Sequence, residues 1–127
     1  DVYKRQGGDL RKTQALIADG QLDVLTGEDE QIFTTLCLGG SGAISAAAHL
    51  RTADFAAVVS LLREGDLLAG RALFHQLLPW IRAAFSEPNP APVKAMLAMQ
   101  GLIADELRAP LLRCSDALRE RLRIELP

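Results

Sequence analysis

The sequence predicts an α/β protein whose first half holds a parallel sheet and whose second half is a small helical bundle. In the first half, two short β-like runs enclose a helical pattern, and this order is typical of a parallel sheet with helices outside. After residue 52 the apolar residues keep helical spacing, and no further strand is predicted. With 127 residues, 49% hydrophobic and 24% charged, the chain is long enough to bury a core.

Four segments make up the first half. Asp9 is the expected N-cap of a helix over residues 10–18. Residues 22–26 form a strand, and residues 28–38 form a helix with acids in its first turn, where they favour the positive end of the helix dipole. Two glycines end this helix. The small apolar residues 43–47 then form a buried strand, which we expect to lie next to the first strand and parallel to it.

The second half contains four predicted helices, and we expect it to be helical from about residue 54 onward. Thr52 or Asp54 begins the first helix, which ends near Arg63. Residues 66–85 form the next helix, in which Pro79 removes one backbone donor and produces a kink. Two more helices are expected over residues 93–102 and 115–126.

Two strands alone do not make a stable parallel sheet, because their edges and faces would be bare. A barrel of eight strand–helix units needs about 250 residues. We therefore expect the chain to hold the last two strands of a (β/α)₈ TIM barrel with their helices, over residues 7–65. A C-terminal helical domain follows over residues 66–127, and the missing part of the barrel precedes residue 7.

Composition and charge exclude several classes of function. The formal net charge is −2 and no basic run occurs, so nucleic acid is not an expected partner. No apolar stretch is long enough for a membrane span, and no signal peptide is recognisable. Cys37 and Cys114 stand far apart and form no metal-ligand pattern, which favours a reducing cytoplasm. We expect no metal and no cofactor.

The stretch LGGSGAIS is the most informative one for chemistry. It lacks the spacings of phosphate-binding loops. It also enters the N-terminal end of its strand, whereas active sites of α/β barrels lie at the carboxyl ends. The strand residues Ile44 to Ala47 would then face a site. The residues alone establish no catalytic set.

Four stretches together resemble the dihydrodipicolinate synthase family of pyruvate-dependent aldolases: LTGEDE, LGGSGAIS, FSEPNPAPVKAMLAMQGL and DELRAPLL. The resemblance runs from Gly7 to about Leu126. It implies a barrel enzyme of lysine and diaminopimelate biosynthesis, a lyase that is usually a cytoplasmic homotetramer. In the family, a lysine on the sixth strand forms a Schiff base with pyruvate, and the resulting enamine attacks aspartate 4-semialdehyde.

Lys4 is in register with this Schiff-base lysine, because Gly8 and Asp9 match the end of the family motif. Arg5 and Gln6 depart from it, since the family has an acid and a small residue there. The hexapeptide DVYKRQ looks like a translated transposase-end adaptor from sequencing-library preparation. We therefore interpret residues 1–6 as a non-native tail and the register of Lys4 as a coincidence. Lys4 is expected to be solvent-exposed or loosely placed.

Ile44 aligns with the family position whose backbone contacts bound pyruvate. The departures follow at residues 47–49, where family members often have Thr-Ala-Asn and this chain has Ala-Ala-His. Leu10 and Leu38 resemble positions near a subunit contact, and ordinary packing within the chain is the alternative for both.

Two other functions stay open. The chain could belong to another pyruvate-dependent aldolase or lyase of the same superfamily, with a different aldehyde as substrate. It could also be a stand-alone helical interaction module in which the strand–helix–strand part is vestigial. Since the other substrate-binding residues of the family lie in the part before this chain, we expect the 127-residue chain itself to be inactive.

Overall fold

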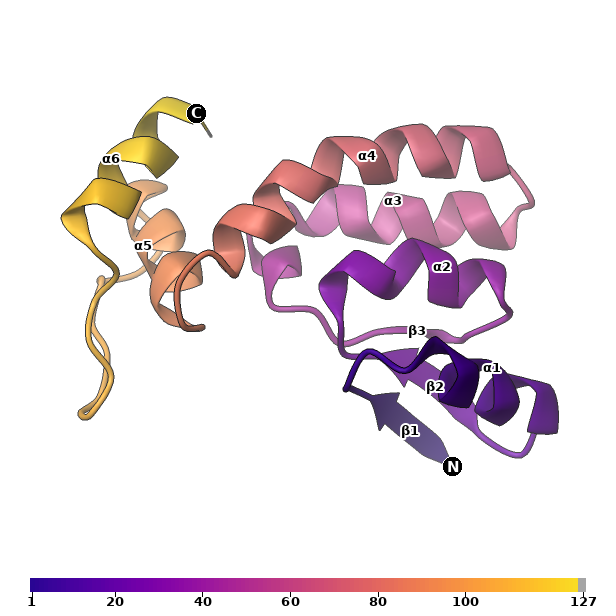
Figure 1. Ribbon diagram of the computed structural model, residues 1–127. Coiled ribbons are helices and arrows are strands. Elements are labelled where there is room, and N and C mark those ends of the chain that lie inside the picture. Colours follow the sequence, from indigo (N-terminus) through magenta and orange to yellow (C-terminus); the bar gives the residue numbers. More distant parts are fainter. Residues whose placement is uncertain (126–127) are drawn as a thin grey trace. The chain divides into compact units, whose positions relative to one another are not determined.

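The computed structural model describes residues 1–125, and the chain divides into two compact units (Figure 1). The first unit contains Asp1–Ser45 and Thr52–Leu77, and the second contains the rest of the described chain. This division follows packing within the chain. The boundary that the sequence predicts at residue 65 concerns the domains of the family, and it stays a prediction.

The first unit is built on a sheet of three parallel strands in the order β1-β2-β3. The strands are β1 (Val2–Arg5), β2 (Asp23–Thr26) and β3 (Gly42–Ala43). In the register of the sheet, Lys4 is opposite Leu25, which in turn is opposite Gly42. The predicted parallel pairing of the two central runs is therefore confirmed.

The number of strands and the form of the N-terminal tail were wrong in the sequence-based prediction. Residues Val2–Arg5 form a strand and pair with β2 over four positions, so the sheet has three strands rather than two. The physical reason is that a parallel ladder is made by backbone groups, and an edge strand accepts almost any side chain that fits the exposed surface. Lys4 is exposed, as predicted, but its backbone is not free.

The last strand is shorter than predicted. Only Gly42–Ala43 pair with β2, although the prediction extended the strand to residue 47. Ala47–His49 instead form the short 3-10 helix η2. Alanine has a weak preference for strands, and Ala47 is fully buried in this turn, so packing decides the local conformation.

Two helices contact β2 and leave one face of the sheet open. They are α1 (Leu10–Asp19) and α2 (Ile32–Cys37), the latter preceded by the 3-10 turn η1 (Asp29–Gln31). On the covered face, Val24 and Thr26 are buried. The predicted N-cap is confirmed, because the Asp9 carboxylate accepts hydrogen bonds from two backbone N–H groups of α1.

The predicted helix boundaries in the middle of the chain are largely confirmed. α3 (Thr52–Arg63) and α4 (Leu67–Ala84) are joined by a short turn. The Asp66 carboxylate accepts a hydrogen bond from the backbone of Ala69 at 3.0 Å, which is the predicted cap. Pro79 lies inside α4. Within the first unit, Phe74 stacks on Phe33 with a centroid distance of 5.7 Å.

The second unit contains α5 (Ala91–Met99) and α6 (Asp116–Glu125), which contact one another. Its core is formed by buried apolar side chains, among them Ile81, Met96 and Leu122. The guanidinium of Arg51 lies over the ring of Trp80 at 5.3 Å. The predicted end of the last helix, Leu126, lies outside the described residues.

Helices are the only regular elements within residues 54–125, as predicted, but the third helix ends at Met99 rather than at residue 102. Residues 100–115 lie between α5 and α6 without a regular helix. Gly101 adopts a left-handed conformation with φ 73° and ends α5. Pro110, which has no backbone N–H, follows in the same segment.

Candidate functional site

The carboxyl ends of the three strands form the candidate site. In a parallel sheet these ends lie at one edge, and here the backbone bonds continue past each strand. The N–H of Gly27 donates to the carbonyl of Arg5 at 2.6 Å, and the N–H of Ile44 donates to the carbonyl of Thr26 at 2.8 Å. The edge is therefore held by hydrogen bonds between neighbouring chain segments.

Lys4 and Ile44 lie on the same open face of the sheet. In the register of the sheet, Lys4 lies beside Leu25, and Leu25 lies beside Gly42. Ile44 comes two residues after Gly42, so it lies beside Gly27, which comes two residues after Leu25. Residues two apart in a strand point to the same side. Ile44 is 48% exposed and Lys4 is also exposed, so neither is covered by the helices of the first unit.

Gly27 leaves space between these two residues. A Cβ atom placed on Gly27 would lie 2.6 Å from Cε of Lys4 and would also meet the side chain of Gln6. The stem of Lys4 therefore lies directly over the bare backbone of Gly27. One strand lies between Lys4 and Ile44, so their backbones are about 10 Å apart. A lysine side chain with a small ketoacid attached to it has about this length.

The turn after β2 is fixed by side chains that the sequence analysis did not single out. The hydroxyl of Thr26 accepts from the N–H of Glu28 at 3.1 Å, and Glu28 in turn accepts from the N–H of Gly7 at 3.0 Å. Asp29 is 4% exposed and accepts a hydrogen bond from the hydroxyl of Ser45 at 2.8 Å. The sequence signal that points to Asp29 is an acidic residue shortly after the end of a strand.

Arg5 faces the covered side of the sheet. It is only 9% exposed, and its Nε atom has no hydrogen-bond partner among the described residues. Among residues 1–125, its terminal nitrogens donate to the carbonyls of Gln6 and Asp9 and to no carboxylate. A buried guanidinium without a carboxylate partner is costly.

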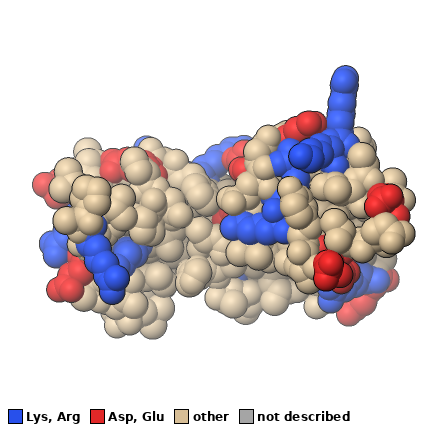
Figure 2. Space-filling model, turned by 90° about the horizontal axis from the view of Figure 1, so that it is seen from below, with Lys and Arg blue, Asp and Glu red and all other residues tan. Residues whose placement is uncertain are grey.

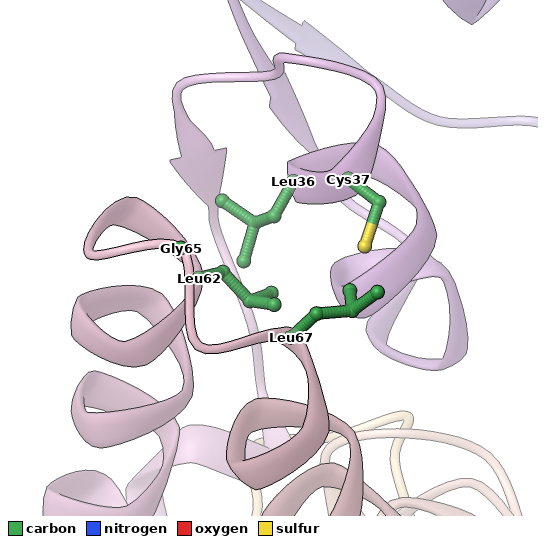
Figure 3. A pocket seen from close by; sticks show the side chains of 5 residues that line it. All are labelled: Leu36, Cys37, Leu62, Gly65 and Leu67. Atoms are coloured by element: carbon green, nitrogen blue, oxygen red, sulfur yellow. The ribbon is translucent and has the colours of Figure 1, made fainter.

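A separate hollow lies away from this edge. It has a volume of about 300 Å³ and is lined by Leu36, Cys37, Leu62, Gly65 and Leu67. In Figure 3 the three leucine side chains point toward one another and the sulfur of Cys37 faces them. The end of α2 leads into the start of β3. The hollow therefore lies near the amino ends of the strands, at the opposite end from the candidate site. Cys37 is an exposed residue, and the partial burial of its thiol raises its pKa above the ordinary value.

The described residues carry a mixed surface charge and two free thiols. On the face drawn in Figure 2, basic and acidic residues are interspersed and most of the area carries neither. Within residues 1–125, no group of three His, Cys, Asp or Glu side chains could hold a metal ion. No helix in that range is long and apolar enough to span a membrane. Both cysteines are free thiols.

Comparisons with known proteins point to one enzyme. The 4-hydroxy-tetrahydrodipicolinate synthase of Syntrophobacter fumaroxidans is 44% identical over 98% of this chain. A dihydrodipicolinate synthase of known crystal structure is 36% identical, with a TM-score of 0.93 over 99% of this chain. The chloride-inhibited enzyme from Acinetobacter baumannii, solved with pyruvate, is 31% identical over 97% of this chain, with a TM-score of 0.91.

The chain spans less than half of each of these proteins: 44% of the first two and 43% of the third. The model of the dihydrodipicolinate synthetase family matches residues 3–126. This match begins before Gly7, where the resemblance was expected to start, and so it includes Lys4. With nearly every residue matched, the chain belongs to the dihydrodipicolinate synthetase family.

Proposed function

We propose that this chain is a segment of a 4-hydroxy-tetrahydrodipicolinate synthase, comprising the end of a (β/α)₈ barrel and the C-terminal helical domain. Members of this family are lyases. The observation that carries the proposal is the family match over residues 3–126, on a chain whose parallel sheet keeps one face open. The open face is the surface that the remaining strands of a barrel would enclose.

The proposed reaction joins pyruvate to aspartate 4-semialdehyde. The amine of the family lysine attacks the ketone of pyruvate, and loss of water leaves a protonated imine. This imine withdraws electrons, so a proton leaves the methyl group and an enamine forms. The enamine carbon then attacks the aldehyde carbon. In this chain the backbone of Ile44 would contact pyruvate, and Gly27 would leave room for it.

We further propose that residues 1–6 were not inherited with the rest of the chain, although the family match extends to residue 3. The state of Arg5 supports this, because a buried guanidinium with an unpaired Nε does not suit the covered face of a sheet. The acid that the family has at this position would carry the opposite charge. Lys4 would then occupy the position of the Schiff-base lysine by coincidence, and the 127-residue chain would not bind pyruvate covalently.

We also propose a cytoplasmic homotetramer for the complete enzyme, acting without a cofactor. Two free thiols are compatible with a reducing compartment. Leu10 is 37% exposed on α1, as a residue of a subunit contact would be in an isolated chain. The protonated imine that the lysine forms with pyruvate is the electron sink, so the proposed chemistry requires no bound metal or coenzyme.

The test uses a hybrid enzyme. Residues 7–127 of this chain are joined to the amino-terminal part of the Syntrophobacter fumaroxidans enzyme, which ends at the residue equivalent to Gln6 and so includes its own Schiff-base lysine. Reduction with borohydride in the presence of pyruvate should give a pyruvyl adduct on that lysine, found by peptide mass mapping. The hybrid should also consume aspartate 4-semialdehyde. A hybrid in which the lysine is replaced by alanine is the control.

The 127-residue chain is treated in the same way, and no adduct is expected on Lys4. An adduct that is absent in Lys4→Ala would show that the hexapeptide is functional sequence. A folded hybrid that traps pyruvate would show that this chain completes a working barrel. Its choice of aldehyde would reflect the amino-terminal donor, because the other substrate-binding residues of the family precede this chain. A folded hybrid that traps no pyruvate would contradict the proposed function.

A further inference from the structure

A buried carboxylate joins the loops that follow β2 and β3. Asp29 is 4% exposed and accepts a hydrogen bond from the hydroxyl of Ser45 at 2.8 Å. The two residues are 16 positions apart in the sequence. A carboxylate is buried only where hydrogen bonds replace its hydration. The hydrogen bond from Ser45 therefore helps to hold Asp29 in place at this edge of the sheet.

Ile44 is held from two sides as a result. On one side its N–H donates to the carbonyl of Thr26 at 2.8 Å. On the other side the next residue, Ser45, is bound to Asp29. The turn that carries Asp29 is itself closed by the hydroxyl of Thr26, which accepts from the N–H of Glu28 at 3.1 Å. The backbone at Ile44 has little freedom to move without breaking one of these bonds.

We infer that Asp29 is a positioning residue for pyruvate, acting through Ser45 on the backbone at Ile44. This inference rests on the proposed function, which gives that backbone its contact with the ketoacid. A hydrogen bond to a charged acceptor is stronger than a neutral one and is directional. Its loss lets the backbone at Ile44 move away from the position that binds the ketoacid, while the fold of the sheet is kept by the ladder bonds of β2 and β3.

A matched pair of the same chemistry lies at the other end of these strands. The hydroxyl of Ser41 donates to the carboxylate of Asp23 at 2.9 Å. Asp23 begins β2 and Ser41 precedes β3, so this pair is at the amino ends, away from the proposed pyruvate contact. Removal of this pair should affect stability alone.

The experiment compares both pairs in the hybrid enzyme. Ser45→Ala and Asp29→Ala should each raise the KM for pyruvate and slow its trapping by borohydride about tenfold, the effect of losing one charged hydrogen bond. The KM for aspartate 4-semialdehyde should stay constant. Ser45→Thr, which keeps the hydroxyl, should restore trapping, and the double alanine variant should be no worse than either single one. Asp23→Ala should leave both KM values unchanged.

The 127-residue chain supplies a second measurement. The amide of Ile44 should exchange its hydrogen faster in Ser45→Ala than in the unchanged chain, and Ser41→Ala should not have this effect. If Asp29→Ala does not fold, Ser45→Ala and Ser45→Thr decide the matter. Unchanged pyruvate kinetics in folded Ser45→Ala would overturn the inference and leave the proposed function intact. Failure of the unmutated hybrid to trap pyruvate would remove both.

Discussion

Thr35 is the clearest case in which one residue carries an unpaired polar group. Its side chain in α2 is fully buried at 0% exposure, and its hydroxyl has no hydrogen-bond partner among the described residues. Replacing it by valine keeps the shape and removes the unpaired hydroxyl. We predict that Thr35→Val raises the free energy of unfolding by about 1 kcal/mol. Urea denaturation of the 127-residue chain measures this change.

Thr13 provides the control for this prediction. It is 2% exposed in α1, but its hydroxyl donates to the carbonyl of Asp9 at 3.2 Å. Thr13→Val should therefore lower the free energy of unfolding by about 1 kcal/mol, the opposite sign. Equal effects of the two substitutions would show that the hydroxyl of Thr35 finds a partner in solution.

Among the elements, α6 begins at a side-chain cap. The hydroxyl of Ser115 accepts from the N–H of Leu118 at 3.1 Å, which caps the helix. The carboxylate of Glu87 accepts from both the hydroxyl and the backbone N–H of Ser115, the latter at 2.9 Å. Glu87 thus links the segment before α5 to the start of α6.

These bonds make the stability of this link depend on pH. The hydrogen bond from the hydroxyl of Ser115, followed by the one from its N–H, lowers the pKa of Glu87 below its ordinary value of 4.5. A depressed carboxyl pKa contributes stability above the unfolded value, and the contribution is lost as the pH falls through the folded value. We predict that helicity falls as the pH drops below 4.5 and that Glu87→Gln makes this fall smaller, as measured by circular dichroism.

Glu106 is the matched control, since it is exposed in the same unit and lies before α6. Glu106→Gln should leave the acid limb of the profile as it is. If both variants follow the unchanged chain below pH 4.5, the link through Glu87 does not contribute to stability in solution.

Gly40 shows how packing constrains the connection between α2 and β3. Its N–H donates to the carbonyl of Thr35 at 2.8 Å. A Cβ atom on Gly40 would lie 2.8 Å from that same oxygen, which belongs to the backbone and cannot swing away. The sequence indicated a helix end here, but only the structure explains why the second glycine has no side chain.

At the scale of the whole molecule, we predict that α1 and the end of α2 contribute to assembly. Leu10 is 37% exposed and Leu38 is half-buried. Replacing both by aspartate in the hybrid enzyme should shift the tetramer toward dimers, because two charges would have to be buried at the contact. Sedimentation velocity measures the change.

The same double substitution at Leu68 and Leu112 is the control. Both leucines are more exposed, at 66% and 83%, and no resemblance assigns them to a subunit contact. A tetramer that survives the substitutions at Leu10 and Leu38 would remove the claim of an interface there.

The sequence by itself determined the class of the fold, the parallel pairing of its central runs and most helix limits. It did so because caps, glycines and apolar spacing act locally: Asp9 and Asp66 cap the helices that their positions predict. The family was also readable from the sequence, since its motifs are short and contiguous. The predicted roles of Lys4 and Ile44 remain predictions.

Only the tertiary structure decided which residues meet at the carboxyl edge. The strand made by the first residues, the short form of β3 and the contact of Asp29 with Ser45 depend on groups that are distant in the sequence. Backbone pairing and burial set these features, and neither has a local pattern. For the same reason no local pattern shows that the side chain of Lys4 lies over Gly27, since the two residues belong to neighbouring segments of the sheet.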